Sequence, residues 1–391
     1  MVKEAISLSK KNNQVIVIFC PISIWGDSFD KDLLYQNSQI KWIRVGAHPK
    51  ENRMKYYLAR IRKKRWDLLY HLFGNICNAA LKSSVLYSQD LEAEARKHKA
   101  DLYIGHNLGA ISAVVKSAKK FNSIASFDFE DFHRGEDLEN SKHCKKTIEI
   151  ENKYVPCLNS ATTASPLITK AYQEFYSIPH IKTILNVFTN TTIDYFINSN
   201  SEQLKLFWFS QTIGMKRGLE FVLSACAKVE PQPKITLLGN CTDNMKDKLY
   251  LRAVEVGFDQ NLLEFKLVVP EIELPKIASQ HHIGLCTEDP GTLNRDLCLT
   301  NKIFTYMLGK NALLLSNTLA QNLFLDQNHE IGQIFNLNNI SQITEKIQLY
   351  QDNRILLDQH RSNSLRMAKE KYNWEYESQI LTQHYHTLLE T

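Results

Sequence analysis

The stretch Lys205–Glu220, KLFWFSQTIGMKRGLE, decides the fold, because its pattern predicts a strand, a loop and the start of a helix in succession. Leu206–Phe209 is a short apolar and aromatic run, which predicts a buried strand. Ser210–Met215 is polar and contains one glycine, so the strand is expected to end there in a loop. Apolar residues then recur at helical spacing and predict a helix that begins near Arg217: Leu219, Val222, Leu223 and Cys226.

A basic pair, Lys216 and Arg217, stands at the start of this predicted helix. The N–H groups and the positive dipole end of a helix N-terminus favour an anion, and a guanidinium can hold two phosphate oxygens at once. The functional interpretation is a diphosphate site that includes the loop around Gly214. The alternative is an ordinary strand–helix turn with solvated basic side chains, and the glycines match neither the dinucleotide fingerprint nor the P-loop.

Strands alternate with helices on both sides of this stretch, which predicts an α/β fold with parallel sheets. Further strands are expected at residues 15–20, 40–45, 101–104, 161–165, 183–187, 234–238, 262–269, 283–286 and 312–315, and residues 341–360 are expected to be helical. Ligands of such sheets bind beyond the C-terminal ends of the strands, so the loops after strands are where functional side chains are sought.

The length of 391 residues suggests two domains. The polar segment between Phe188 and Gln203 is the best linker, so we expect an N-terminal domain over residues 1–200 and a C-terminal domain over residues 201–365. A last helix, from about Ser364 to Glu390, is too long and aromatic to be a tail, and residues 366–391 are expected to pack back on the first domain.

Composition is that of a soluble globular protein, with 43% apolar and 23% charged residues. The eight cysteines form no C-x-x-C pair, which favours reduced thiols in a cytoplasmic protein over a zinc site or a disulfide framework. No signal peptide and no apolar stretch long enough to span a membrane are apparent. The net charge of +5 is mild, and the basic residues cluster mainly at 53–65 without a nucleic-acid-binding motif, so no nucleic-acid partner is expected.

Residues 55–73 differ from the rest of the chain. They contain a dense basic cluster at Arg60 and Arg62–Arg65 with Trp66 beside it, together with apolar residues at 58, 61, 68, 69, 72 and 73. A basic helix that carries Trp and Leu can lie on an anionic bilayer, which would make the protein peripheral at the inner face of the membrane. The alternative is a surface helix with a solvated basic face.

In the N-terminal half, two predicted strands run into polar residues. His106 and Asn107 follow the first strand and are candidate acceptor-side residues, although a lone histidine is more often structural. The second runs into FDFEDFHR at residues 127–134, where phenylalanines would bury ionisable groups and shift their pKa values toward those useful for proton transfer. The candidates here are Glu130, Asp131 and His133 as catalytic residues and Arg134 on the acceptor side, and the alternative is a charged loop with structural salt bridges.

In the C-terminal half, Glu288 follows the predicted strand 283–286, where it could bind sugar hydroxyls or simply be exposed. Lys302 stands near the start of a predicted amphipathic helix. It is a second candidate phosphate contact, and the alternative is a solvated lysine.

Several stretches, taken together and in order, resemble the GT-B glycosyltransferases of the large retaining family four, or "group 1", type. In the N-terminal half they are ADLYIGHN at 100–107, FDFED at 127–131, ATTASP at 161–166 and ILNV at 184–187. In the C-terminal half they are residues 210–220, NKIFTYM at 301–307 and YNWE at 372–375. The resemblance implies two Rossmann-like domains that face across a cleft, with the donor bound by the C-terminal domain and the acceptor facing the N-terminal one.

The resemblance also implies roles for individual residues. Arg217 stands where the family usually has a phosphate-binding Lys, and Gln211 stands where it usually has an Arg. Thr305 replaces the glutamate that holds the ribose, which leaves Asn301, Lys302 and Glu288 as substitutes. Glu130 replaces the histidine that touches the transferred sugar, and His133 or His106 is a candidate to take over that contact.

The implied reaction moves a sugar, with retention, from a nucleotide-diphospho-sugar to a hydroxyl of a glycan or lipid-linked acceptor, as in surface polysaccharide assembly. Neither a metal nor a cofactor beyond the donor is expected, because side chains can neutralise the departing diphosphate. Three alternatives stay open: a GT-B-fold nucleotide-sugar epimerase, a metal-dependent GT-A transferase suggested by Asp30-Lys31-Asp32, and a non-catalytic sugar- or nucleotide-binding subunit.

Overall fold

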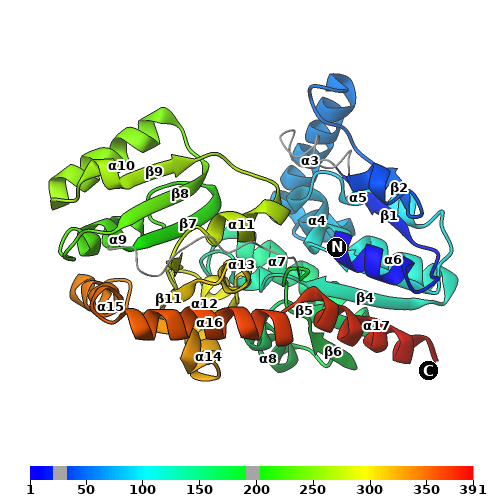
Figure 1. Cartoon of the computed structure of the whole chain (residues 1–391). Coiled ribbons are helices and arrows are strands. Elements are labelled where there is room, and N and C mark those ends of the chain that lie inside the picture. Colours follow the sequence, from blue (N-terminus) through cyan, green and yellow to red (C-terminus); the bar gives the residue numbers. More distant parts are fainter. Residues whose placement is uncertain (21–32, 191–202, 391) are drawn as a thin grey trace. The chain divides into compact units, whose positions relative to one another are not determined.

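The computed structural model describes residues 1–20, 33–190 and 203–390, which divide into two compact units (Figure 1). Unit 1 comprises Met1–Ile184, Thr292–Asn294 and Ser378–Thr391, and unit 2 comprises Leu185–Gly291 and Arg295–Glu377. Most of the expected linker and the Asp30-Lys31-Asp32 pattern lie outside the described residues. No described helix is both long and apolar enough to cross a membrane.

Unit 1 contains two parallel sheets. One pairs β1 (Ile16–Phe19) with β2 (Lys41–Arg44). The other has the order β3-β4-β5-β6 and is built from Leu102–His106, Ile124–Phe129, Ser160–Thr163 and His180–Thr183. Its helices are α1 (Val2–Ser9), α3 (Arg53–Phe73), α4 (Ala79–Ser84), α5 (Ser88–Ala95), α6 (Ile111–Phe121), α7 (Lys142–Tyr154), α8 (Pro166–Phe175) and most of α17 (Trp374–Glu390).

Unit 2 contains a six-stranded parallel sheet with the order β12-β11-β10-β7-β8-β9. The strands are β7 (Lys205–Thr212), β8 (Lys234–Asn240), β9 (Leu263–Lys266), β10 (Ile283–Cys286), β11 (Ala312–Ser316) and β12 (Gly332–Phe335). Its helices are α9 (Leu219–Cys226), α10 (Asp243–Val256), α11 (Leu274–Ala278), most of α12 (Leu293–Leu297), α13 (Asn301–Leu308), α14 (Leu319–Asp326), α15 (Ile340–Asp352) and α16 (Arg354–Glu370).

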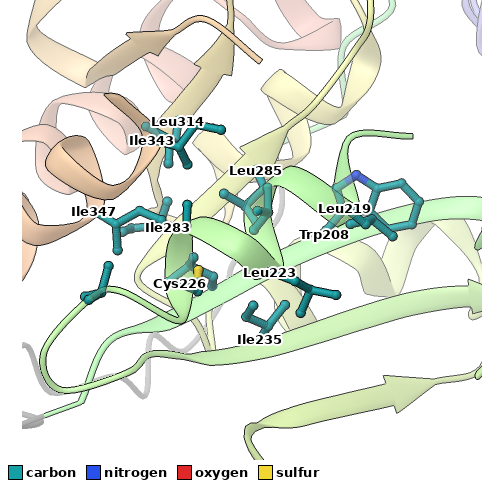
Figure 2. Close-up of a cluster of buried hydrophobic side chains, with 14 of the residues drawn as sticks. Trp208, Leu219, Leu223, Cys226, Ile235, Ile283, Leu285, Leu314, Ile343 and Ile347 are labelled. Atoms are coloured by element: carbon teal, nitrogen blue, oxygen red, sulfur yellow. The ribbon is translucent and has the colours of Figure 1, made fainter. Parts of the chain in front are cut away.

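β7 is buried on both faces, as a central parallel strand should be. Alternate side chains point to opposite faces of the sheet. Leu206 and Trp208 join the apolar cluster that also contains residues of α9 and α15 (Figure 2). On β7, Phe207 stacks on His281 and Phe209 packs edge-on against Tyr306. The predicted strand, loop and helix at 205–226 are confirmed, with the strand running three residues further, to Thr212.

Some element boundaries were predicted wrongly. The strand expected at 183–187 is β6, which lies earlier, at His180–Thr183. Its residues alternate between exposed and half-buried, so the strand is not a buried apolar run.

Two helices that were expected to be continuous are each broken at an asparagine. Asn353 accepts from Leu356 N–H at 3.0 Å and begins α16. Asn373 accepts from Tyr376 N–H at 2.9 Å and donates to the Lys369 carbonyl at 2.9 Å, so it caps the end of α16 and the start of α17.

The packing of β10 against α13 gives the first testable prediction. A Cβ at Gly284 would lie 2.1 Å from Cγ of the buried Tyr306. We expect Gly284→Ala to lower the free energy of unfolding of unit 2 by at least about 2 kcal/mol, because the ring has no space to retreat. Urea unfolding measures this. Gly291→Ala is the control, since its Cβ would meet no atom closer than 3.8 Å. Equal stability of the two variants would contradict the packing described.

Candidate functional site

In unit 2, polar residues gather at the C-terminal ends of three neighbouring strands. β10 pairs with β7 on one side and with β11 on the other. The loop bearing Arg217 follows β7, Glu288 follows β10, and Ser316 ends β11. This edge of the sheet is where ligands of parallel α/β folds bind.

A buried chain of hydrogen bonds anchors the backbone of the loop that carries Arg217. Trp208 Nε1 donates to Thr287 Oγ1 at 2.9 Å, and Thr287 Oγ1 donates to the Arg217 carbonyl at 2.5 Å. Gly218 adopts a φ of +80° and packs so closely that a Cβ would lie 2.7 Å from that of Thr287. The backbone is therefore anchored while the Arg217 side chain is exposed.

The exposed side of this loop has room for an anion. The Arg217 guanidinium donates to Ser210 Oγ at 2.8 Å, and a Cβ at Gly214 would meet no atom within 4 Å. The Glu220 carboxylate already occupies part of this helix N-terminus, because it accepts a hydrogen bond from Lys216 N–H at 2.7 Å. A bound phosphate would therefore share this N-terminus with Glu220.

Lys302 and Glu288 form a largely buried ion pair beside the loop. Lys302 Nζ lies 2.5 Å from Glu288 Oε1 and 5.4 Å from the centre of the Trp208 ring. Gln321 donates to the other Glu288 oxygen at 2.8 Å. Burial acts to raise the pKa of Glu288, but the charge and hydrogen bond of Lys302 outweigh it and lower that pKa. Glu288 is thus ionised and orients Lys302.

This geometry bears on the residues expected to hold a ribose. Thr305 is fully buried and donates within α13 to the Asn301 carbonyl at 3.3 Å, which turns its hydroxyl away from any ligand. Both oxygens of Glu288 already accept hydrogen bonds, so it is better placed to position Lys302 than to bind a ribose. Asn301, at the start of α13, and Gln211, in β7, are both exposed.

In unit 1, strand register builds a second polar cluster. His106, Asp128 and Thr162 are register partners across β3, β4 and β5, so their side chains meet in a row. His106 Nδ1 lies 3.1 Å from Asp128 Oδ2, and Thr162 donates to Asp128 Oδ1 at 2.7 Å. His106 is thus the last residue of a strand, where the sequence predicted a loop.

A second acid reaches His106 from outside the sheet. Glu4 of α1 lies 2.5 Å from His106 Nε2, and Tyr385 of α17 donates to the other Glu4 oxygen at 2.8 Å. Burial acts to lower the pKa of His106, but Glu4, Asp128 and Glu130 together raise it well above its usual value. Burial acts to raise the pKa of Glu4, and the His106 charge reverses this and lowers it. The surrounding carboxylates therefore favour the protonated, imidazolium form of His106.

Glu130 is the more accessible acid of this cluster. Its carboxylate lies 3.5 Å from His106 Nδ1, and this contact with the His106 ring lowers the pKa of Glu130. It lines a cavity of 1780 Å³ within unit 1 together with His106, Asn107 and His133. An ionised carboxylate with 38% of its side chain exposed can accept a hydrogen bond from a hydroxyl that enters the cavity.

The other candidates of this segment have different surroundings. Asp131 accepts from Asn294 Nδ2 at 2.9 Å. His133 is buried and lies 2.5 Å from Glu136. Burial acts to lower its pKa, but this pairing raises it. Arg134 lies 2.6 Å from the buried Glu151 and over the Phe175 ring, which favours a structural role over the predicted acceptor contact.

His106, Asp128 and Glu130 also offer ligand atoms within 4.8 Å of one another, a spacing that a metal ion could accept. Because Glu4, Asp128 and Glu130 raise the pKa of His106, the ring would have to release a stabilised proton before it could bind such an ion.

Comparison with solved structures places this arrangement in a known fold. No protein-family model matches the sequence, and no curated protein sequence matches it. Sucrose-phosphate synthase from Thermosynechococcus elongatus superposes with a TM-score of 0.72 at 12% identity, over 99% of this chain and 92% of that one. Anabaena HepE in complex with UDP superposes with a TM-score of 0.69 at 13% identity, over 99% and 96%. The chain has the GT-B fold.

A third structure with this fold, the UDP-forming α,α-trehalose-phosphate synthase from Burkholderia vietnamiensis, superposes with a TM-score of 0.64 at 9% identity, over 95% of this chain and 99% of that one.

The structure of this protein also reveals site residues that sequence reasoning missed. Trp208 and Thr287 support the loop of the candidate donor site, and Glu4 and Tyr385 complete the His106 cluster. Of these residues, only Trp208 could have been noticed in the sequence, because it lies in the predicted strand just before the loop that carries Lys216 and Arg217.

The chain from Trp208 through Thr287 to Arg217 gives a prediction for unit 2. We expect Thr287→Val to cost about 1–3 kcal/mol of unfolding free energy, because it leaves Trp208 Nε1 and the Arg217 carbonyl unpaired. In the double variant with Trp208→Phe, the loss of unfolding free energy should differ from the sum of the two single losses by about 1 kcal/mol. Urea unfolding of the two single variants and the double variant measures this, and additive costs would contradict the chain.

The His106 cluster gives a prediction about pH. Because the pKa of His106 is raised in the folded state, its contribution to stability is fully present below the ordinary histidine pKa of about 6.5 and is lost as pH rises through the folded value. We expect His106→Gln to lower the unfolding free energy of unit 1 by about 3 kcal/mol at pH 6, because it leaves the buried Glu4 without the positive charge of His106. The difference from wild type should narrow as pH rises.

Urea unfolding across this pH range, with the exposed His180→Gln as control, checks the cluster. A difference that does not change with pH would show that His106 is not held as an imidazolium.

Proposed function

We propose that this protein is a glycosyltransferase that moves a sugar from a nucleotide-diphospho-sugar to an acceptor hydroxyl. One observation carries the proposal: in a GT-B fold, unit 2 presents the exposed Arg217 on an anchored loop at the strand ends, next to the largely buried Lys302–Glu288 pair. Solved structures of this fold include HepE complexes with UDP and with UDP-glucose. A donor diphosphate is the ligand that this cationic edge fits best.

In the proposed reaction, the acceptor oxygen forms a bond to the anomeric carbon while the bond from that carbon to the diphosphate breaks. Arg217 and Lys302 stabilise the negative charge that develops on the departing diphosphate. The acceptor proton leaves to a diphosphate oxygen or to a carboxylate, and Glu130 or Asp131 orients the hydroxyl. Retention of configuration and independence from metal are part of the proposal.

We further propose a cytoplasmic enzyme whose acceptor is a glycan or a lipid-linked sugar, in surface polysaccharide or glycoconjugate assembly. A non-catalytic nucleotide-sugar-binding subunit is the second candidate. The burial of Thr305 and the engagement of both Glu288 oxygens favour it, because they give a ribose fewer partners than an active site would offer.

A thermal-shift screen against UDP, GDP, ADP and CMP tests the donor site, because a ligand of the folded state raises the melting temperature. We expect a shift with one nucleoside diphosphate, lost in Arg217→Ala and kept in Lys228→Ala, which removes an exposed cation at the far end of α9. No shift with any nucleotide, or an equal shift in Arg217→Ala, would contradict the proposal.

Turnover separates the candidate functions once the base is known. Incubation with the matching nucleotide-sugar and a panel of glycan and lipid-linked acceptors should release the nucleoside diphosphate and form a new glycoside. Binding without turnover would favour the non-catalytic subunit, and conversion of the donor sugar without acceptor would favour an epimerase.

A further inference from the structure

Helix α3 presents its apolar side chains outward. Met54, Leu58, Ile61, Leu68 and Leu72 are between 55% and 74% exposed, although all belong to a helix that packs on unit 1. At about 100° per residue these positions, with Arg65, fall within about 40° of a single line along the helix. This outer stripe extends over about 27 Å from Met54 to Leu72.

The inner face of α3 is polar and is fixed by specific contacts to unit 1. Asp67 lies 2.6 Å from Lys146 of α7. Tyr70 donates to Glu149 of α7 at 3.0 Å, and Lys82 Nζ of α4 lies 4.0 Å from the centre of the Trp66 ring. Arg62 pairs with Asp90 of α5. These contacts set the rotation of the helix about its axis, so the outer stripe is the face that the described residues of unit 1 leave uncovered.

Basic side chains border the stripe. Arg53, Arg60, Lys64 and His71 are exposed and project about 80 to 120° to one side of it. Arg65 is exposed within the stripe itself. Lys and Arg can extend their charged ends to a polar boundary while their stems lie along an apolar one.

We propose that the outer stripe of α3 lies in the surface of an anionic lipid bilayer. Its apolar side chains would enter the boundary between headgroups and acyl chains, while its bordering cations contact lipid phosphates. A second copy of the chain fits less well, because it would bring a basic border of the same sign. A nucleic acid fits less well too, because the stripe between the cations is apolar.

The position of α3 also bears on the acceptor. Tyr56, in the second turn of α3, and His48 line the same unit 1 cavity as His106 and Glu130. A headgroup carried by a lipid would therefore reach this cavity from the helix that rests on the bilayer. This last step depends on the proposed function, whereas binding of α3 to the bilayer does not.

Flotation of the full chain with vesicles tests the surface without any nucleotide. We expect binding to phosphatidylcholine vesicles that contain phosphatidylglycerol, weaker binding to phosphatidylcholine alone, and loss of binding at high salt. Replacing Leu68 and Leu72 by Ser should lower the partition coefficient roughly tenfold or more. Replacing Arg60, Lys64 and Arg65 by Gln should lower it roughly fivefold for each charge.

Leu251→Ser with Val254→Ser is the matched control, because it removes two comparably exposed apolar side chains from α10 of unit 2. It should bind vesicles as the wild type does. The proposal would be overturned if the wild type does not bind the vesicles, or if both α3 variants bind them as strongly as the wild type does. So would a wild-type dimer in light scattering that Leu68→Ser with Leu72→Ser converts to a monomer. Because flotation needs no donor, its failure leaves the nucleotide screen unaffected.

Discussion

Parallel strand register is the constraint on which both polar clusters depend. Parallel strands end at the same edge of a sheet, so residues that are distant in sequence meet there. In unit 1, register alone sets His106 beside Asp128 and Asp128 beside Thr162. In unit 2, the pairing of β10 with β7 brings Thr287 beneath the Arg217 loop. The chemistry of each unit follows from which residues stand at these strand ends.

The two clusters differ in how they treat charge. In unit 2, the largely buried Lys302–Glu288 pair is neutral overall, and the exposed Arg217 adds the net positive charge that suits a diphosphate. In unit 1, a single imidazolium faces three carboxylates, so the cluster is acidic overall and suits hydroxyl groups as hydrogen-bond donors. On the proposed function, this division would make unit 2 the donor side and unit 1 the acceptor side.

Sequence reasoning reached the parallel α/β fold because strands such as Leu206–Phe209 are apolar runs followed by loops and periodic helices. It missed β12, whose sequence GQIF is not an apolar run. It also missed the breaks at Asn353 and Asn373, where an asparagine side chain caps a new helix and the apolar pattern alone would continue the old one. The strand-end residues Arg217, Glu288 and His106 could be found because they follow predicted strands.

What surrounds those residues could not be found in the same way. The Glu4 and Tyr385 contacts join the two ends of the chain, and no local pattern encodes a contact across that separation. The burial of Thr305 and the pairing of Lys302 with Glu288 depend on how α13 packs against its sheet. Likewise, the sequence of α3 indicated an amphipathic basic helix, but only its inward polar contacts show which face is uncovered.

The central claim is that the strand ends of unit 2 bind the diphosphate of a nucleotide donor. Hydrogen exchange with and without a saturating nucleoside diphosphate tests it most directly, because it reports where the ligand orders the backbone. The account predicts slower exchange in residues 213–220 and 287–303. Protection confined to other segments, or no protection at a concentration that saturates binding, would contradict it.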